Sequence, residues 1–232
     1  MQFSSTAPFA DRFEAGRELA GRLGAYAHRS DVIVLALPRG GVPVAAVVAA
    51  ALEVPLDVFL VRKLGVPLRP ELAMGAIASG GVRVLNRDVV GWYGITDDMI
   101  DRVAQAEQAE LERREREYRQ GRPPLEVRGR TVILVDDGLA TGSSMRAAVQ
   151  AVRHMGPAKV VVAVPVGAPA TCTELASVAD EAICARTPEP FSAVGQWYLD
   201  FSQTTDAEVR TLLDEHASIA ASKPREVGEG GG

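Results

Sequence analysis

The hydrophobic pattern of the chain alternates between a helical period and continuous apolar runs. Apolar residues recur at three-, four- and seven-residue spacings over residues 9–27, which predicts an amphipathic helix. Apolar runs rich in β-branched residues are typical of strands buried on both faces. Such runs occupy residues 32–37, 57–61, 131–135, 159–166 and, more briefly, 181–185, and predicted helices lie between them at 43–52, 145–156 and 170–179. This order predicts an α/β fold with an open, mainly parallel five-stranded sheet flanked by helices.

The middle of the chain interrupts this rhythm and predicts an insertion. Residues 73–78 and 82–85 are expected to pair as a hairpin across Ser79-Gly80-Gly81. A long helix is predicted over 97–120, because Thr96 is suited to cap its start and Gly121 and two prolines follow its end. Its acid-to-base pairs at i,i+4 favour a solvated connecting helix, and these pairs are Glu110 with Arg114, Glu112 with Arg116 and Glu115 with Arg119.

These elements predict a single domain over residues 1–220. Its core is expected at about 30–62 and 130–186, with the insertion at about 63–128 and a small hood segment at about 187–205. The composition of residues 221–232 is typical of a disordered tail.

Composition narrows the classes of protein that this chain can represent. Lysines and arginines number 25 and acids 30, a net charge of −5, which argues against a dedicated nucleic-acid binder. No apolar run approaches the length that spans a membrane, and no secretory signal is visible. The two cysteines, Cys172 and Cys184, form no disulfide framework or CxxC motif and are expected to be buried small apolar residues. We therefore expect a reduced, cytoplasmic protein without a membrane partner.

The segment with the clearest chemistry is VILVDDGLATGSS, residues 132–144. A predicted buried strand delivers Asp136 and Asp137 to its carboxyl end, where open α/β sheets bind ligands. A turn of small and hydroxyl residues follows at residues 138–144, and a predicted helix starts near Ser144. Exposed peptide N–H groups, hydroxyls and the helix N-terminus together favour a bound phosphate. Carboxylates repel phosphate, so the two acids are expected to hold sugar hydroxyls or a divalent cation.

This segment closely resembles the phosphoribosyl-diphosphate (PRPP) loop of type I phosphoribosyltransferases. The resemblance implies that Asp136 and Asp137 are catalytic and bind magnesium. It also implies that the 5-phosphate of PRPP is bound by a set of consecutive residues, namely Ala140, Thr141, Gly142, Ser143 and Ser144. One departure is Gly138, where the family usually has an aliphatic residue. The overall pattern is most similar to bacterial phosphoribosyltransferases of unassigned acceptor.

The resemblance extends to the loop after the first strand, which binds pyrophosphate in this family. Residues 38–41 (Pro-Arg-Gly-Gly) occupy that place, so Arg39, Gly40 and Gly41 are expected to bind pyrophosphate, with a non-proline cis peptide between Pro38 and Arg39. Lys63 resembles a second basic position that reaches the same group. Residues 64–81 match the mobile loop that closes over the substrate, in which Glu71 is a candidate general base.

The C-terminal segment bears a looser resemblance to 6-oxopurine phosphoribosyltransferases. There an aromatic residue stacks on the base and an aspartate binds magnesium, which makes Phe191 and Asp200 the candidates here. The alternative is that Phe191 and its aromatic neighbours simply pack a hood on the sheet. Those enzymes also place an aspartate where this chain has Ala140, which disfavours a hypoxanthine–guanine activity through that acid.

The expected function is transfer of phosphoribose from PRPP to a nucleophile, such as a base-type nitrogen, with release of pyrophosphate and with Mg²⁺ as cofactor. By resemblance the protein is expected to be a homodimer that binds PRPP and a small-molecule acceptor. Two alternatives stay open. One is a non-catalytic regulator that senses PRPP or a nucleotide on the same fold. The other, less favoured, is a receiver-type signalling module, which would need a phosphoacceptor at the end of a strand where Asp180 instead precedes one.

Overall fold

The centre of the molecule is a parallel sheet of five strands in the order β2-β1-β6-β7-β8. The computed structural model describes residues 7–123 and 125–222. The strands are β1 (Val32–Ala36), β2 (Leu56–Val58), β6 (Thr131–Val135), β7 (Lys159–Val166) and β8 (Glu181–Arg186). All five residues of β1 and of β6 are buried, as the continuous apolar runs predict. The predicted fold class is therefore confirmed, although the second strand is shorter than the 57–61 run.

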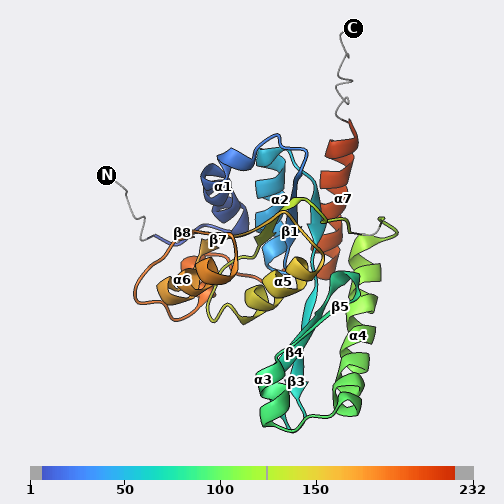
Figure 1. The fold of residues 1–232 in the computed structure, drawn as a ribbon. Coiled ribbons are helices and arrows are strands. Elements are labelled where there is room, and N and C mark those ends of the chain that lie inside the picture. Colours follow the sequence, from blue (N-terminus) through green and yellow to red (C-terminus); the bar gives the residue numbers. More distant parts are fainter. Residues whose placement is uncertain (1–6, 124, 223–232) are drawn as a thin grey trace.

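Two helical layers cover this sheet, because its alternating side chains supply two apolar faces. Val34 and Ile133 point into one core, which includes residues of α1 (Arg12–Arg22), α2 (Gly41–Leu52) and α7 (Asp206–Ser222). Leu35 and Leu134 point into the other, with α5 (Ser143–His154) and α6 (Pro169–Val178). Figure 1 shows the two layers on opposite sides of β1.

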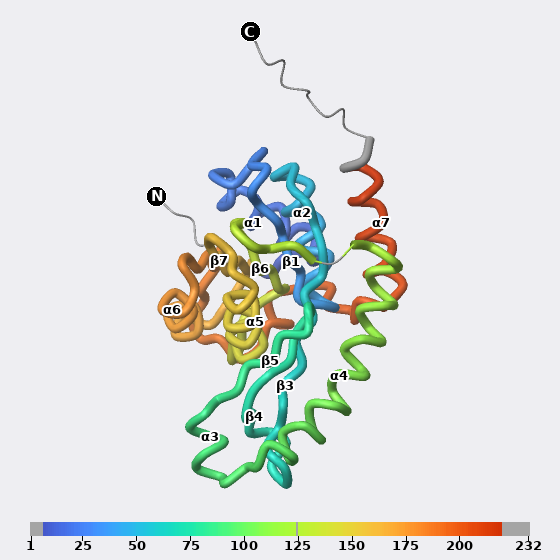
Figure 2. The backbone as a smooth tube through the Cα atoms, turned by 45° about the vertical axis from the view of Figure 1, so that its right-hand side comes forward, coloured from blue at the N-terminus to red at the C-terminus, as the bar shows by residue number. Residues whose placement is uncertain are grey.

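The insertion forms an arm that extends away from the central sheet (Figures 1 and 2). It contains a three-stranded antiparallel sheet of β3 (Val61–Val66), β4 (Arg69–Ala78) and β5 (Val82–Leu85), followed by α3 (Arg87–Trp92) and α4 (Asp97–Arg119). The predicted hairpin of β4 and β5 is present. Strand β3 was not predicted, because its glycine and flanking prolines resemble a loop; Leu64 and Val66 are nevertheless buried in the core that contains α4 residues.

Helix α4 is more than the solvated connector that its charges suggested. Thr96 caps it as predicted, with its hydroxyl oxygen accepting a hydrogen bond from the Met99 N–H. Ile100 and Leu111 are almost fully buried, so one side of the helix packs in the core. Arg119 does not pair with Glu115; it makes an ion pair of 2.9 Å with Asp57 of β2. The last turn of α4 is thus anchored on the central sheet.

Helix α7 was not predicted, and it extends the fold beyond the expected hood. Thr205 and Glu208 form a capping box at its start, and Val209 and Leu213 are fully buried against the sheet side. Of the expected disordered tail, residues 221–222 belong to this helix and the rest lies outside the described residues.

A buried histidine on α7 predicts a pH dependence of stability. The ring Nε2–H of His216 donates to the Val54 carbonyl at 2.9 Å, and burial lowers the pKa of His216. A lowered pKa in the folded state means that protonation favours the unfolded chain, so this contribution to stability is present above about pH 6.5 and is lost as the pH falls. We expect the free energy of unfolding to drop between pH 7 and 5 more in the wild type than in His216→Gln, measured by urea denaturation. Equal drops in the two proteins would contradict this assignment.

The two cysteines form a disulfide, which corrects the expectation of two free thiols. Cys172 of α6 and Cys184 of β8 are bonded, with their Cα atoms 6.5 Å apart. Their spacing of 12 residues carries no local signal, because only the packing of α6 on β8 brings the side chains together.

The helices of the described residues were compared with the length and hydrophobicity that a membrane span requires, and none of them meets both.

Candidate active site

The predicted phosphate loop forms a hollow at the carboxyl end of β6. All five residues expected to bind the 5-phosphate, 140–144, line this hollow of about 180 Å³, together with Asp136 and Val194. Gly142 has a φ of +66° at the start of α5, and a Cβ atom there would lie 2.6 Å from Thr171 Cγ2. The Thr171 hydroxyl donates to the Ala140 carbonyl at 2.7 Å. The conformation of the loop therefore requires glycine at position 142, and a hydrogen bond from Thr171 fastens the loop to α6.

Asp136 and Asp137 are close, mostly buried carboxylates with different partners. Arg12 reaches Asp137 Oδ2 with two nitrogens, each at 2.9 Å. Asp136 accepts the Asp137 N–H at 2.9 Å and, among the described residues, has no cation within ion-pair distance. Burial, and then the charge of Asp137, raise the pKa of Asp136 well above its ordinary value. Burial also raises the pKa of Asp137, and Arg12 opposes that rise.

The loop after β1 lies directly against these acids. The peptide bond between Pro38 and Arg39 is cis, as predicted. A Cβ atom on Gly40 would overlap Asp137 Oδ2, and one on Gly41 would lie 2.7 Å from the Val135 carbonyl oxygen. The fold thus brings together the two loops that the sequence assigned to one substrate. The Arg39 side chain lies 3.7 Å from Asp206 at the start of α7.

Arg12 is a site residue that no sequence motif indicates, since it lies within the amphipathic pattern of residues 9–27. Its guanidinium group lies over the Phe201 ring at 4.1 Å from the centroid and donates to the Ser202 carbonyl at 2.8 Å. The Tyr198 hydroxyl donates to the carbonyl of Asp137 at 2.5 Å. The second acid is therefore held by residues from both ends of the chain. No local signal marks Arg12, because 125 residues separate it from Asp137.

The hood segment packs on the site through small and aromatic residues. A Cβ atom on Gly138 would lie 2.5 Å from Val194 Cγ1, so the departure from the family pattern at 138 leaves room for the hood. Phe191 stacks on Trp197 with ring centroids 6.5 Å apart, and both pack against the cluster of Phe9 and its buried neighbours. This arrangement agrees with the packing alternative for Phe191; its role toward a base stays a prediction.

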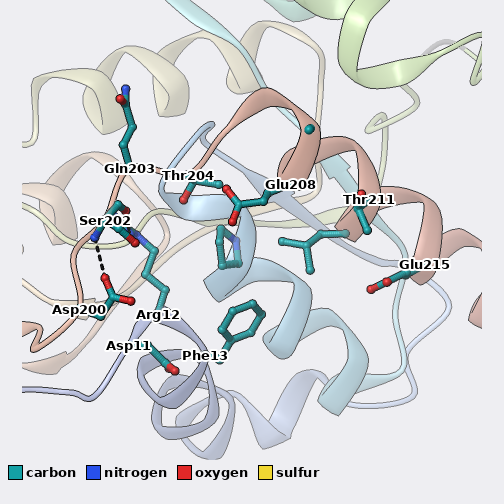
Figure 3. A pocket seen from close by; sticks show the side chains of 13 residues that line it. Asp11, Arg12, Phe13, Asp200, Ser202, Gln203, Thr204, Glu208, Thr211 and Glu215 are labelled. Carbon is teal, nitrogen blue, oxygen red and sulfur yellow. Dashed lines mark hydrogen bonds between the residues drawn. The ribbon is translucent and has the colours of Figure 1, made fainter.

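Asp200 lines a different hollow from the one that Asp136 lines. It accepts the Ser202 N–H at 2.9 Å and lines a hollow of about 450 Å³ between α1 and α7, whose lining includes neither Asp136 nor Asp137. Figure 3 shows Arg12 and Asp200 at one end of this hollow and Glu215 at the other. Among the described residues, no three His, Cys, Asp or Glu side chains are arranged to hold a metal ion. The structure therefore does not bring Asp200 to the acids as a third ligand.

Lys63 and Glu71 belong to the arm and share a third hollow. It has a volume of about 620 Å³ and is also lined by Ser143 of the phosphate loop. Residues 39–41, which are expected to bind pyrophosphate, do not line it. The expected roles of Lys63 at pyrophosphate and of Glu71 as a base stay predictions.

Comparison with known proteins decides the family. The model of the phosphoribosyl transferase domain matches residues 10–185. The chain belongs to this family. The match covers both loops of the site and decides against the receiver-type signalling module.

Individual relatives of this phosphoribosyltransferase-family chain agree. "Putative phosphoribosyl transferase Rv0571c" of Mycobacterium tuberculosis H37Rv is 50% identical over 206 residues, 89% of this chain and 46% of the relative. "Putative phosphoribosyl transferase MT0597" of strain CDC 1551 gives the same values. The chain thus spans less than half the length of these curated relatives. The crystal structure of TT1426 from Thermus thermophilus is 44% identical, with a TM-score of 0.81, covering 90% of this chain and 98% of that one.

Proposed function

We propose that this protein transfers phosphoribose from PRPP to a nitrogen of a base-type acceptor and releases pyrophosphate. The observation that carries the proposal is the meeting of the 38–41 loop with the acid pair at the entrance of the 140–144 loop. One loop suits a diphosphate, the other a phosphate, and the carboxylates between them suit the ribose that joins the two groups. Family membership supports phosphoribosyl transfer in general.

The residues of the phosphate loop would bind and orient the substrate. Thr141 and Ser144 offer hydroxyls, and the N–H groups of residues 140–144 lie at the N-terminus of α5, whose dipole favours an anion. Because Gly142 and Thr171 fix the loop before substrate arrives, little ordering is needed on binding. This rigidity supports the assignment of the 5-phosphate to this end of the site.

Asp136 and Asp137 would act on the sugar. In the proposed reaction the bond from ribose C1 to the diphosphate oxygen breaks and a bond from C1 to the acceptor nitrogen forms. The diphosphate leaves with the bonding electrons, and the acceptor nitrogen gives up its proton to solvent. Positive charge develops on the ribose meanwhile, and nearby carboxylates stabilise it. Arg12 opposes the rise that burial causes in the pKa of Asp137 and would aim its carboxylate at the ribose hydroxyls.

Magnesium fits the donor set of this site. The two carboxylates are mostly buried and raise each other's need for a cation, yet among the described residues only Asp137 has one, Arg12. Oxygen donors of this kind are those that Mg²⁺ prefers. When bound, magnesium would neutralise charge on the diphosphate, and Asp136 and Asp137 would hold it directly or through water. Arg39 and the N–H groups of Gly40 and Gly41 would bind the same diphosphate.

The partners of the reaction follow from this proposal. We propose a homodimer, as the family resemblance implies. Support comes from exposed apolar side chains in the turn between β3 and β4, around the end of α3 and in the first turn of α4, segments that lie at the far end of the arm in Figure 1. These side chains are Leu68, Trp92, Tyr93 and Met99. We also propose a cytoplasmic location, where such substrates are met.

Calorimetric titration of PRPP tests the proposed function. We expect magnesium-dependent binding to the wild type, and its loss in the double variant Asp136→Asn/Asp137→Asn, because the acids would no longer hold the ribose and the metal. A screen of bases for pyrophosphate release then identifies the acceptor.

Absence of binding at millimolar PRPP would reject the transferase proposal. The regulatory alternative on the same fold would then be tested with other nucleotides. Binding that is unchanged in the double variant would instead move the substrate away from the acid pair.

A further inference from the structure

The two faces of the arm sheet differ in how their cations are neutralised. Directly opposed residues in an antiparallel sheet share a face, and neighbours along a strand point to opposite faces. Arg62, Ile77 and Arg83 are opposed in this way on one face. On that face Arg62 pairs with Glu107 and Arg83 with Asp101, both on α4. These two cations on the α4 face, Arg62 and Arg83, therefore each have their own carboxylate.

The opposite face carries cations without such partners. Lys63 is opposed to Ala76, which is opposed to Val84, and this row faces α5. Among the described residues, neither Lys63 nor Arg87 at the start of α3 makes an ion pair. Both line the hollow of about 620 Å³ between the arm and α5. Positive charge is thus left uncompensated around an open space.

The remaining lining of the hollow suits an anion. Arg146 of α5 adds a third cation, although one of its nitrogens also contacts Glu174 at 3.1 Å. Asn86 and Gln150 add amide donors, and the one acidic side chain is Glu71. Three cations against one acid leave a net lining charge of +2. Guanidinium and ammonium groups around one space are suited to phosphoryl oxygens.

We propose that this hollow is a second anion site, which binds a small molecule carrying phosphoryl groups and is distinct from the PRPP diphosphate position. It shares Ser143 with the phosphate-loop hollow and no residue with the 38–41 loop. If the proposed function holds, its occupant meets the 5-phosphate end of PRPP, whereas the reacting C1 lies at the other end of the ribose. The occupant is therefore an effector and not the acceptor. Binding of the anion itself does not depend on the proposed function.

Titration of inorganic pyrophosphate into the full chain without magnesium tests this proposal. The variants are Arg87→Gln in the hollow and Arg83→Gln on the opposite face of the same sheet, which removes the same charge. A third variant, Arg39→Gln, removes the cation of the proposed diphosphate loop. We expect two binding events in the wild type. Arg87→Gln should weaken one of them by about tenfold, since it removes a charge-assisted hydrogen bond, and Arg83→Gln should leave both within about twofold.

The outcomes separate this proposal from the proposed function. The second site would be overturned if Arg87→Gln left the affinities of both binding events unchanged. It would also be overturned if Arg87→Gln and Arg83→Gln weakened pyrophosphate binding equally. A single wild-type event that only Arg39→Gln removes would also overturn it. If the wild type showed one binding event and only Arg87→Gln weakened it, the second site would be supported. The proposed role of Arg39 at the diphosphate would then lose its support. Thermal melts of all variants check that each chain is folded.

Discussion

Asp137→Asn is expected to lower turnover at least about tenfold, which corresponds to a loss of about 1.4 kcal/mol of transition-state stabilisation. Arg12 holds the Asp137 carboxylate, and the Tyr198 hydroxyl donates to the main-chain carbonyl of the same residue, so the fold fixes this charge in place. Asparagine keeps an oxygen for Arg12 but removes the negative charge that stabilises the sugar cation. The measurement is pyrophosphate release from PRPP with the acceptor found in the base screen.

A matched control separates this effect from a general change in charge. Asp101→Asn removes one carboxylate from the exposed side of α4, far along the chain from either loop, and should leave turnover within about twofold. Near wild-type turnover in Asp137→Asn, with unchanged thermal unfolding, would remove this acid from the mechanism.

Gly41→Ala is expected to damage both the fold and PRPP binding. A Cβ atom there would lie 2.7 Å from the Val135 carbonyl oxygen and 2.9 Å from Asp136 Cα. Both are backbone atoms of β6 and its following residue, which cannot move as a flexible side chain does. Overpacking of this kind costs about 1–3 kcal/mol, and relief of the overlap must separate the two substrate loops. We expect a lower melting temperature and at least about tenfold weaker PRPP binding, measured by thermal unfolding and calorimetry.

Gly21→Ala supplies the comparison for this change. Nothing lies within 4 Å of the position of its added Cβ, and it sits inside α1. Alanine should therefore stabilise the helix by about 0.5–1 kcal/mol and leave PRPP binding unchanged. If Gly41→Ala behaved in the same way, the close approach of the two loops would have no role in binding.

The sequence predicts those parts of the molecule whose signals are local. Asp136 and residues 138–144 line one hollow, because a buried strand, two acids and a small-residue turn follow one another directly; their role toward a phosphate stays a prediction. The cis peptide at Arg39 was predicted from the family resemblance of four adjacent residues. Helix α7 also carries local signals, a capping box at Thr205 and apolar residues at i,i+4, and was missed although they are present.

Other features arise only from tertiary packing. Arg12 and Asp137 meet because α1 and the hood close over β6 from opposite ends of the chain. Cys172 and Cys184 bond because α6 packs on β8. The face on which Lys63 lies depends on the pleat of β3, a strand that its glycine and prolines concealed. These contacts cannot be predicted from the spacing of the residues along the chain.

Helix α4 is anchored at its last turn, so a rotation at that end would move the far end of the arm. Its last turn is held by Arg119 on Asp57 and by the Tyr118 hydroxyl on Asp206, whereas its first turn lies at the far end of the arm (Figure 1). A helix of 23 residues is about 34 Å long, so a rotation of about 10° at the anchored end displaces the other end by about 6 Å. Asp206 also lies 3.7 Å from Arg39. The anchored end of α4 therefore adjoins the 38–41 loop, and a small angular change there would produce a large displacement at the far end of the arm.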